Sequence, residues 1–103
     1  MALRIVYRPL ARDDLKDIYD ALEKAAGPEV AFGVVEAIEK RCETLSTFLE
    51  RGTPRPEIGP GVRSIPFRRR ATIAYRVDAE EISVIGIMYA GRDLAVLKEP
   101  GRQ

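Results

Sequence analysis

Residues 62–77 read VRSIPFRRRATIAYRV, and they set the fold class of the chain. Two short runs rich in β-branched and aromatic residues, Val62 to Phe67 and Ala71 to Asp78, flank three arginines at positions 68–70. Two such runs joined by a short polar connection predict an antiparallel β-hairpin. We therefore expect the arginines at 68–70 at or near its turn, where a run of charge is most often solvated.

A third strand follows a tight connection at residues 79–81. It is Ile82 to Tyr89, and the connection is too short for a crossover helix, so this strand is also antiparallel. In a two-layer domain, helices cover only one sheet face, so apolar residues on the other face need a loop, the C-terminal tail or a partner protein as cover. Strict alternation puts Ile82, Val84 and Met88 on one face and Ile85, Ile87 and Tyr89 on the other. Residues 93–103 can add a short edge strand.

Upstream of the hairpin, apolar residues recur at helical spacing in two segments separated by Gly27-Pro28. Pro28 suits the first position of the second helix, where its missing N–H costs nothing. The second stripe continues to about residue 50. The two stripes are Leu15, Ile18, Tyr19, Leu22 and Ala26, and then Ala31, Val34, Val35, Ile38, Cys42, Leu45, Phe48 and Leu49.

A strand and a loop flank these helices. Residues 3–8 read LRIVYR and predict a first strand that ends at Pro9. Residues 51–61 hold three prolines and three glycines and predict a loop. The element order is thus β-α-α-β-β-β. We expect an α+β, two-layer fold in which an antiparallel helical hairpin packs on one face of the sheet.

Size and composition predict one globular domain over residues 1–103. The chain is 46% hydrophobic and 32% charged, and its apolar runs are far shorter than the roughly 20 residues that span a bilayer. The N-terminal MALRIVYRPLARDD lacks the apolar core of a signal peptide. We expect a cytoplasmic protein with no membrane partner.

The residue types exclude most common active sites. There is no histidine and only one cysteine, Cys42, which falls on an apolar helical stripe where cysteine is usually a small buried hydrophobe. No Walker or dinucleotide-binding motif occurs, and Ser64 has no histidine or nearby lysine to activate it. Asp13, Asp14 and Asp17 fall in the first helical turns, where carboxylates stabilise the helix dipole. We therefore expect no catalytic residues, metal or cofactor.

Charge divides the chain into two halves. Residues 1–50 carry a net charge of −3, and residues 51–103 carry +4. Nine of the ten basic residues in the second half are arginines, whose planar guanidinium suits carboxylate and phosphate partners. The second half is therefore the expected contact surface for an acidic partner.

Several motifs resemble the ParE branch of the RelE/ParE toxin superfamily over nearly the whole chain. One is A-x-x-D-L-x-x-I-Y from Ala11 to Tyr19, and another is P-x-P-E-I-x-P-G-V-R-S-I-P-F from Pro54 to Phe67. Ala74 to Val77 and Met88 to Asp93 add to the likeness. The resemblance implies a RelE/ParE-like fold: an N-terminal strand, a helical hairpin and three to four antiparallel strands.

The resemblance also implies a function. It indicates the toxin of a type II toxin-antitoxin system, associated with growth inhibition and plasmid stabilization, that poisons DNA gyrase and is not an enzyme. Its partner would be a ParD-like ribbon-helix-helix antitoxin, whose C-terminal segment wraps the toxin and could cover the strand from Ile82 to Tyr89. We expect no direct sequence-specific DNA binding by the toxin itself.

Two alternatives stay open. A RelE-type ribosome-dependent mRNA endonuclease would use Arg63, Arg76 and Arg92 to stabilise phosphate charge. RelE-type members carry an arginine where this chain has Thr72, and a catalytic tyrosine beyond Arg92, whereas Tyr89 is the last tyrosine here. The second alternative is a non-toxic antitoxin-binding module. The candidate target- or antitoxin-contacting residues are Arg63, Arg76, Arg92, Tyr89 and Met88.

Overall fold

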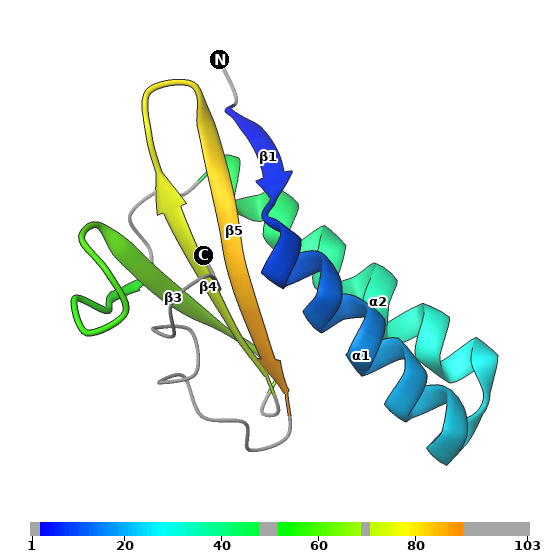
Figure 1. The fold of residues 1–103 in the computed structure, drawn as a ribbon. Helices are drawn as coiled ribbons and strands as arrows, with labels where there is room; N and C mark the ends of the chain where they lie inside the picture. The colour runs from blue at the N-terminus through cyan, green and yellow to red at the C-terminus, as the bar shows by residue number, and fades with distance from the viewer. Residues whose placement is uncertain (1–2, 48–51, 69–70, 90–103) are drawn as a thin grey trace.

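The computed structural model describes residues 3–47, 52–68 and 71–89, and these form a helical layer and a sheet (Figure 1). The α+β architecture, with a strand, a helical pair and then further strands, confirms the predicted fold class. Within the described residues, no helix is long and apolar enough to cross a membrane. In chain order the elements are β1 (Arg4–Tyr7), α1 (Pro9–Ala26), α2 (Pro28–Glu43), a 3-10 turn (Thr44–Ser46), β2 (Thr53–Pro54), β3 (Val62–Phe67), β4 (Ala71–Val77) and β5 (Glu81–Tyr89).

Within the described residues, the sheet has five strands in the order β1-β5-β4-β3-β2. The predicted hairpins are confirmed, since β3 pairs antiparallel with β4, and β4 with β5. β1 lies parallel to β5, with Ile5 opposite Ile82. β5 is therefore an internal strand, which explains why its sequence is apolar on both faces.

The loop predicted for residues 51–61 contains a strand that the sequence did not predict. Thr53 and Pro54 form β2 and pair with Ser64 and Arg63 of β3. Proline lacks a backbone donor but is tolerated at the edge of a sheet, which is where β2 lies. The prolines and glycines of the segment predict a loop, and a strand of two residues is too short to show an alternating pattern among them.

The helical hairpin turns at Gly27, whose φ of 96° lies in the region that favours glycine. Pro28 begins α2 as predicted, and Pro9 both ends the first strand segment and begins α1. α2 ends at Glu43 and passes into the 3-10 turn, earlier than the predicted end near residue 50. Phe48 and Leu49 of the predicted stripe lie outside the described residues.

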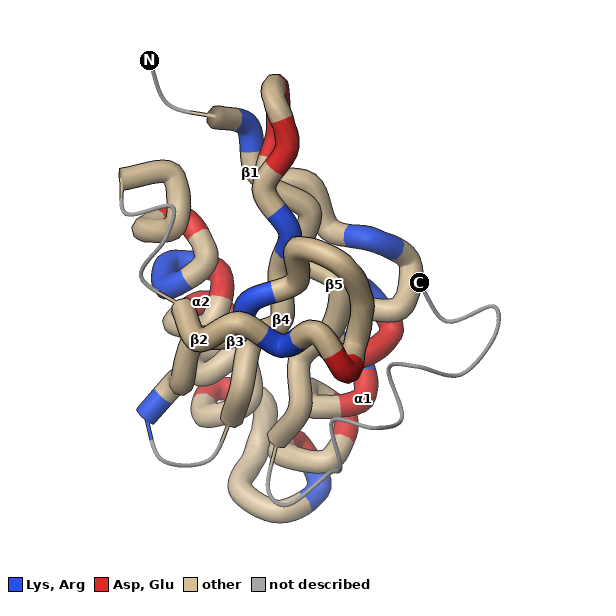
Figure 2. Tube along the Cα trace, turned by 90° about the vertical axis from the view of Figure 1, so that its left-hand side faces the viewer, with Lys and Arg blue, Asp and Glu red and all other residues tan. Residues whose placement is uncertain are grey.

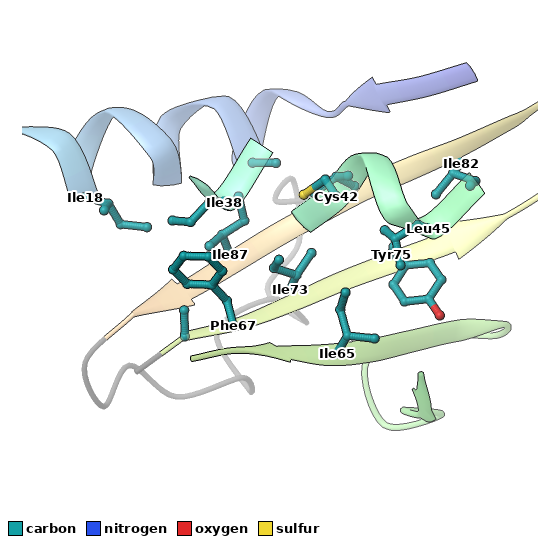
Figure 3. Packing of buried hydrophobic residues seen from close by; sticks show 13 residues of the cluster. Ile18, Ile38, Cys42, Leu45, Ile65, Phe67, Ile73, Tyr75, Ile82 and Ile87 are labelled. Carbon is teal, nitrogen blue, oxygen red and sulfur yellow. The ribbon is translucent and has the colours of Figure 1, made fainter. Parts of the chain in front are cut away.

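The main core lies between the helices and the sheet (Figure 3). Cys42 is fully buried there, as its place on the apolar stripe predicted. Tyr7 of β1 packs against this cluster, so side-chain packing ties the first strand to the core that α2 helps to form. The buried members of this helix-side cluster are Ala11, Ile18, Ile38, Cys42, Leu45, Ile65, Phe67, Ala71, Ile73, Tyr75, Ile82, Val84 and Ile87.

A β-bulge in β5 overturns the predicted faces of that strand. Ala74 pairs with Gly86 and Tyr75 with Val84, so Ile85 has no partner on β4. The extra residue reverses the alternation beyond it, and strict period-2 counting therefore placed Met88 and Ile87 on the wrong faces. Met88 and Ile85 instead belong to a second buried cluster on the opposite side of the sheet, the far-face cluster: Leu10, Ile58, Val62, Ala74, Ile85 and Met88.

Candidate functional site

Arg63 is held by the backbone that precedes β2. It lies in β3 opposite Tyr75, and its Nη1 donates to the Gly52 carbonyl over 2.8 Å. The Tyr75 hydroxyl accepts a hydrogen bond from the Gly52 N–H at 3.1 Å. Arg63 and Tyr75 thus fix both polar groups of one buried glycine. Arg63 therefore holds the backbone at Gly52 in place. Its predicted role in binding a target or antitoxin stays a prediction.

Arg76 lies on the far face of the sheet, opposite Val62 of β3. Its Nε donates to the Pro60 carbonyl over 3.1 Å, and its stem runs along the turn that contains Gly59 and Gly61. The side chain is half-buried. Within residues 3–47, 52–68 and 71–89, no carboxylate forms an ion pair with its guanidinium.

Arg55 shares this face but was not singled out from the sequence. Its Nε donates to the Ser64 hydroxyl over 2.8 Å, and its Nη1 lies 3.9 Å from Glu57 Oε2. The Ser64 oxygen is therefore held by a cation, which is not an arrangement that activates a serine for attack. The pairing of β2 with β3 brings Arg55 to Ser64. The sequence did not predict this contact, because it predicts the segment as a loop.

The remaining candidates come from the end of β5. Met88 is only 4% exposed, and it lies opposite Thr72 of β4. Tyr89 is half-buried and packs against the helix-side cluster. Arg92 lies outside the described residues. The structure therefore places Met88 and Arg76 on the far face and Arg63 and Tyr89 on the helix side, so the predicted residues do not form one cluster.

Asp14 differs from its predicted role. Because α1 begins at Pro9, Asp14 lies beyond the first turn, and its side chain is buried at 1% exposure. Its Oδ2 accepts a hydrogen bond from the Ile87 N–H of β5 at 2.9 Å. Pairing with β1 ends at Val84, so the Asp14 carboxylate satisfies the edge of β5 where the neighbouring strand has stopped.

Charge is distributed over the fold as the two halves of the sequence predict. Acidic positions follow α1 and α2, whereas basic positions lie across β3 and β4 (Figure 2). Glu29, Glu36, Glu39 and Glu43 are all exposed along α2. Acidic residues therefore outnumber basic ones on both helices, whereas β3 and β4 each carry an arginine, Arg63 and Arg76.

The chemistry available on this surface is recognition of anions. Guanidinium groups bind carboxylates and phosphates through paired N–H donors. Among the described residues, no group of three or more cysteine, aspartate or glutamate side chains is placed to hold a metal ion. On the far face, Arg55 and Arg76 supply such donors.

Comparison with known proteins relates the chain to toxins. The family model described as ParE toxin of type II toxin-antitoxin system, parDE, matches residues 5–94. No curated protein matches the chain. Among solved structures, the chain is similar to one from the chromosomal ParDE toxin-antitoxin system of P. aeruginosa. Their identity is 28% and their TM-score 0.75, and the match covers 87% of this chain and 98% of that one.

A second similar structure comes from the RelBE2 toxin-antitoxin complex of Mycobacterium tuberculosis. The identity is 22% and the TM-score 0.57, with coverage of 86% of this chain and 99% of that one. At this identity the likeness concerns the fold alone. Both structures were obtained from toxin-antitoxin systems, and both are covered almost completely by this chain.

Proposed function

Because the chain belongs to the ParE toxin family of type II toxin-antitoxin systems, we propose that it poisons DNA gyrase and is neutralised by a ParD-like antitoxin. It would act in the cytoplasm, where gyrase and DNA are found. The toxin would not be an enzyme itself: it would bind gyrase and trap the broken DNA that gyrase forms during its own reaction.

The observation that carries the choice of gyrase over RNA cleavage is Thr72. It lies on the far face of β4, opposite Met88, at the position where the RelE-type pattern has an arginine. A threonine hydroxyl carries no charge with which to stabilise a developing phosphate dianion. Tyr89 is also the last tyrosine of the chain, so the tyrosine expected after Arg92 has no counterpart.

The test is a gyrase assay with the purified chain and plasmid DNA. We expect supercoiling to be lost and linear, gyrase-cleaved plasmid to accumulate as the protein concentration rises. The same protein bound to its antitoxin is the matched control and should leave supercoiling intact. Full supercoiling without cleaved DNA, at protein concentrations well above that of gyrase, would reject gyrase as the target.

In one alternative, a ribosome-dependent endonuclease, Arg76 would bind RNA phosphate, since its guanidinium has no ion-paired carboxylate among the described residues. Primer extension on translated mRNA after induction would then reveal discrete cuts at the ribosomal A site. A non-toxic module that only binds antitoxin would instead leave growth unchanged when soluble, folded protein is induced alone.

A further inference from the structure

The three arginines around β2 and β3 differ in how their guanidinium nitrogens are used. Arg63 donates from Nη1 to the Gly52 carbonyl. Arg55 donates from Nε to Ser64 and has Glu57 beside Nη1. In each of these two arginines, therefore, the terminal nitrogen Nη1 already has a partner within the protein.

Arg76 uses its guanidinium differently. Its side-chain hydrogen bond within the described part of the chain runs from Nε to the Pro60 carbonyl, over 3.1 Å. The two terminal nitrogens, Nη1 and Nη2, have no carboxylate partner in residues 3–47, 52–68 and 71–89. The bond at Nε fixes the plane of the group, and a guanidinium held in this way can bind an anion end-on through its two terminal nitrogens.

The surroundings of Arg76 strengthen such a contact. Val62, its cross-strand partner, is 2% exposed and belongs to the far-face cluster together with Ile58. Gly59 lies against the guanidinium, since a side-chain carbon there would be 3.2 Å from Nη2. A charge pair at the border of an apolar cluster is screened less by water than one on an open surface. The group is therefore oriented before a partner arrives, which lowers the entropy cost of binding.

We propose that Arg76 is the residue of this sheet that binds a carboxylate of the antitoxin, through a bidentate contact at Nη1 and Nη2. The proposal rests on the proposed function, because it requires an antitoxin with an acidic segment. Of the four predicted residues that the structure describes, Arg63, Arg76, Met88 and Tyr89, it selects the one with the geometry for the task. Arg63 instead holds the chain in front of β2.

A peptide carboxylate fits this site better than a nucleic-acid backbone does. Tight binding to nucleic acid depends on neutralising several phosphates, each with its own basic group. Arg55 and Arg63, the nearest basic side chains along β2 and β3, are bonded to Ser64 and Gly52. Of these three described arginines, Arg76 is the one that bonds through Nε alone, and its outer edge matches one carboxylate.

The experiment measures binding of the full chain to the ribbon-helix-helix antitoxin encoded in the adjacent reading frame. We expect Arg76→Gln to weaken the complex at least about tenfold, as truncating one partner of a desolvated charge pair does. Arg76→Lys, which keeps the charge but loses the planar fork, should fall between Arg76→Gln and wild type. Arg12→Gln, at an exposed position of α1, is the matched control and should bind within about twofold of wild type.

Charge reversal separates direct contact from a folding defect. Arg76→Glu would be combined with an antitoxin set in which each Asp or Glu of the C-terminal half is changed to Arg in turn. Restoration of at least about tenfold in affinity by one member of the set supports a direct pair, because a misfolded surface would not respond to a single reversed charge.

The outcomes that count against the inference are distinct from those that count against the function. If wild-type toxin does not bind the antitoxin, the proposed partner fails. If wild type binds and Arg76→Gln binds as well as Arg12→Gln, the assignment of Arg76 is wrong while the partner stands. If Arg76→Gln keeps antitoxin binding but loses retention on a polyuridine column, Arg76 serves nucleic acid instead.

Discussion

Gly52 occupies a position where even one added carbon does not fit. A Cβ atom there would lie 2.6 Å from the Tyr75 hydroxyl and 2.8 Å from the Ser64 carbonyl oxygen. The carbonyl belongs to the backbone of β3 and cannot move aside alone. We predict that Gly52→Ala lowers the free energy of unfolding by about 1–3 kcal/mol, the usual cost of overpacking a close contact. Urea unfolding followed by circular dichroism measures this change in the free energy of unfolding.

Gly33 is the matched control for this substitution. It lies in the interior of α2, and a Cβ there would meet nothing within 4 Å. Gly33→Ala should raise the free energy of unfolding by about 1 kcal/mol, because alanine is the better helix former. Similar destabilisation by both substitutions would contradict the steric account of Gly52.

For single residues, the sequence predicted whether a side chain is buried better than it predicted which groups the side chain bonds to. Cys42 is buried because its spacing along the helix places it on the apolar stripe. Arg63 and Arg76 were equivalent in the sequence, both being arginines within predicted strands. Gly52 and Pro60, whose carbonyls they bind, lie in a segment predicted only as loop. Side-chain contacts to an irregular backbone leave no periodic signal, so the sequence could not separate the two.

One carboxylate of α1 hydrogen-bonds to the backbone of β5. Asp14 is buried and accepts the Ile87 N–H beyond the last residue that β1 pairs. Asp14→Ala would leave this N–H without that acceptor, and an unsatisfied buried donor costs about 1–3 kcal/mol. We predict a loss of stability in that range and faster hydrogen exchange of the Ile87 amide, measured by urea unfolding and by NMR.

Asp13→Ala is the control for Asp14, because Asp13 is the neighbouring carboxylate and is exposed. It should change stability by no more than about 0.5 kcal/mol and leave exchange at Ile87 unaltered. Slow exchange at Ile87 in Asp14→Ala would mean that another group holds this edge of β5.

The elements were predicted well where their period was regular and poorly where it was interrupted. α1 and the β3–β4 hairpin follow helical or alternating patterns and lie where those patterns placed them, and α2 does so up to its end at Glu43. The bulge at Ile85 shifts the alternation by one residue, and no residue type in ISVIGIMY marks that position. β2 is two residues long, too short to show any period.

For the molecule as a whole, stability should fall at alkaline pH. Burial raises the pKa of the Cys42 thiol to about 11 from its ordinary 9.0, and burial also raises the pKa of the Tyr7 hydroxyl. Both groups stay neutral in the folded state after they ionise in the unfolded chain. The Cys42 contribution is complete below pH 9 and is lost as pH rises from 9 through 11, by an amount on the order of 2 kcal/mol, whereas the Tyr7 contribution begins to be lost only above pH 10.

The measurement is the urea midpoint between pH 7 and pH 11. Cys42→Ala removes the thiol titration, so its stability should be lower at pH 7 but should decline less steeply between pH 9 and 11 than that of wild type. Parallel curves for the two proteins would contradict a titrating thiol in the core.

The arrangement of the whole sheet was only partly predictable. Short connections made β3, β4 and β5 antiparallel neighbours, and that prediction is confirmed. The place of β1 beside β5 was not predicted, because no local pattern links Ile5 to Ile82. Pairing between strands at opposite ends of a sequence is decided by the packing of all the elements between them.

The parallel pair of β1 and β5 has a consequence for synthesis. β1 is among the first segments to be made, yet its only neighbour in the described sheet begins at Glu81. While the ribosome adds the intervening residues, β1 has no strand to join, and closing so long a loop slows folding. A nascent chain halted before β5 would have its helical hairpin but not the strand against which α1 packs. Premature termination should therefore yield chains without the completed sheet, so the cell would make no folded toxin until β5 had emerged.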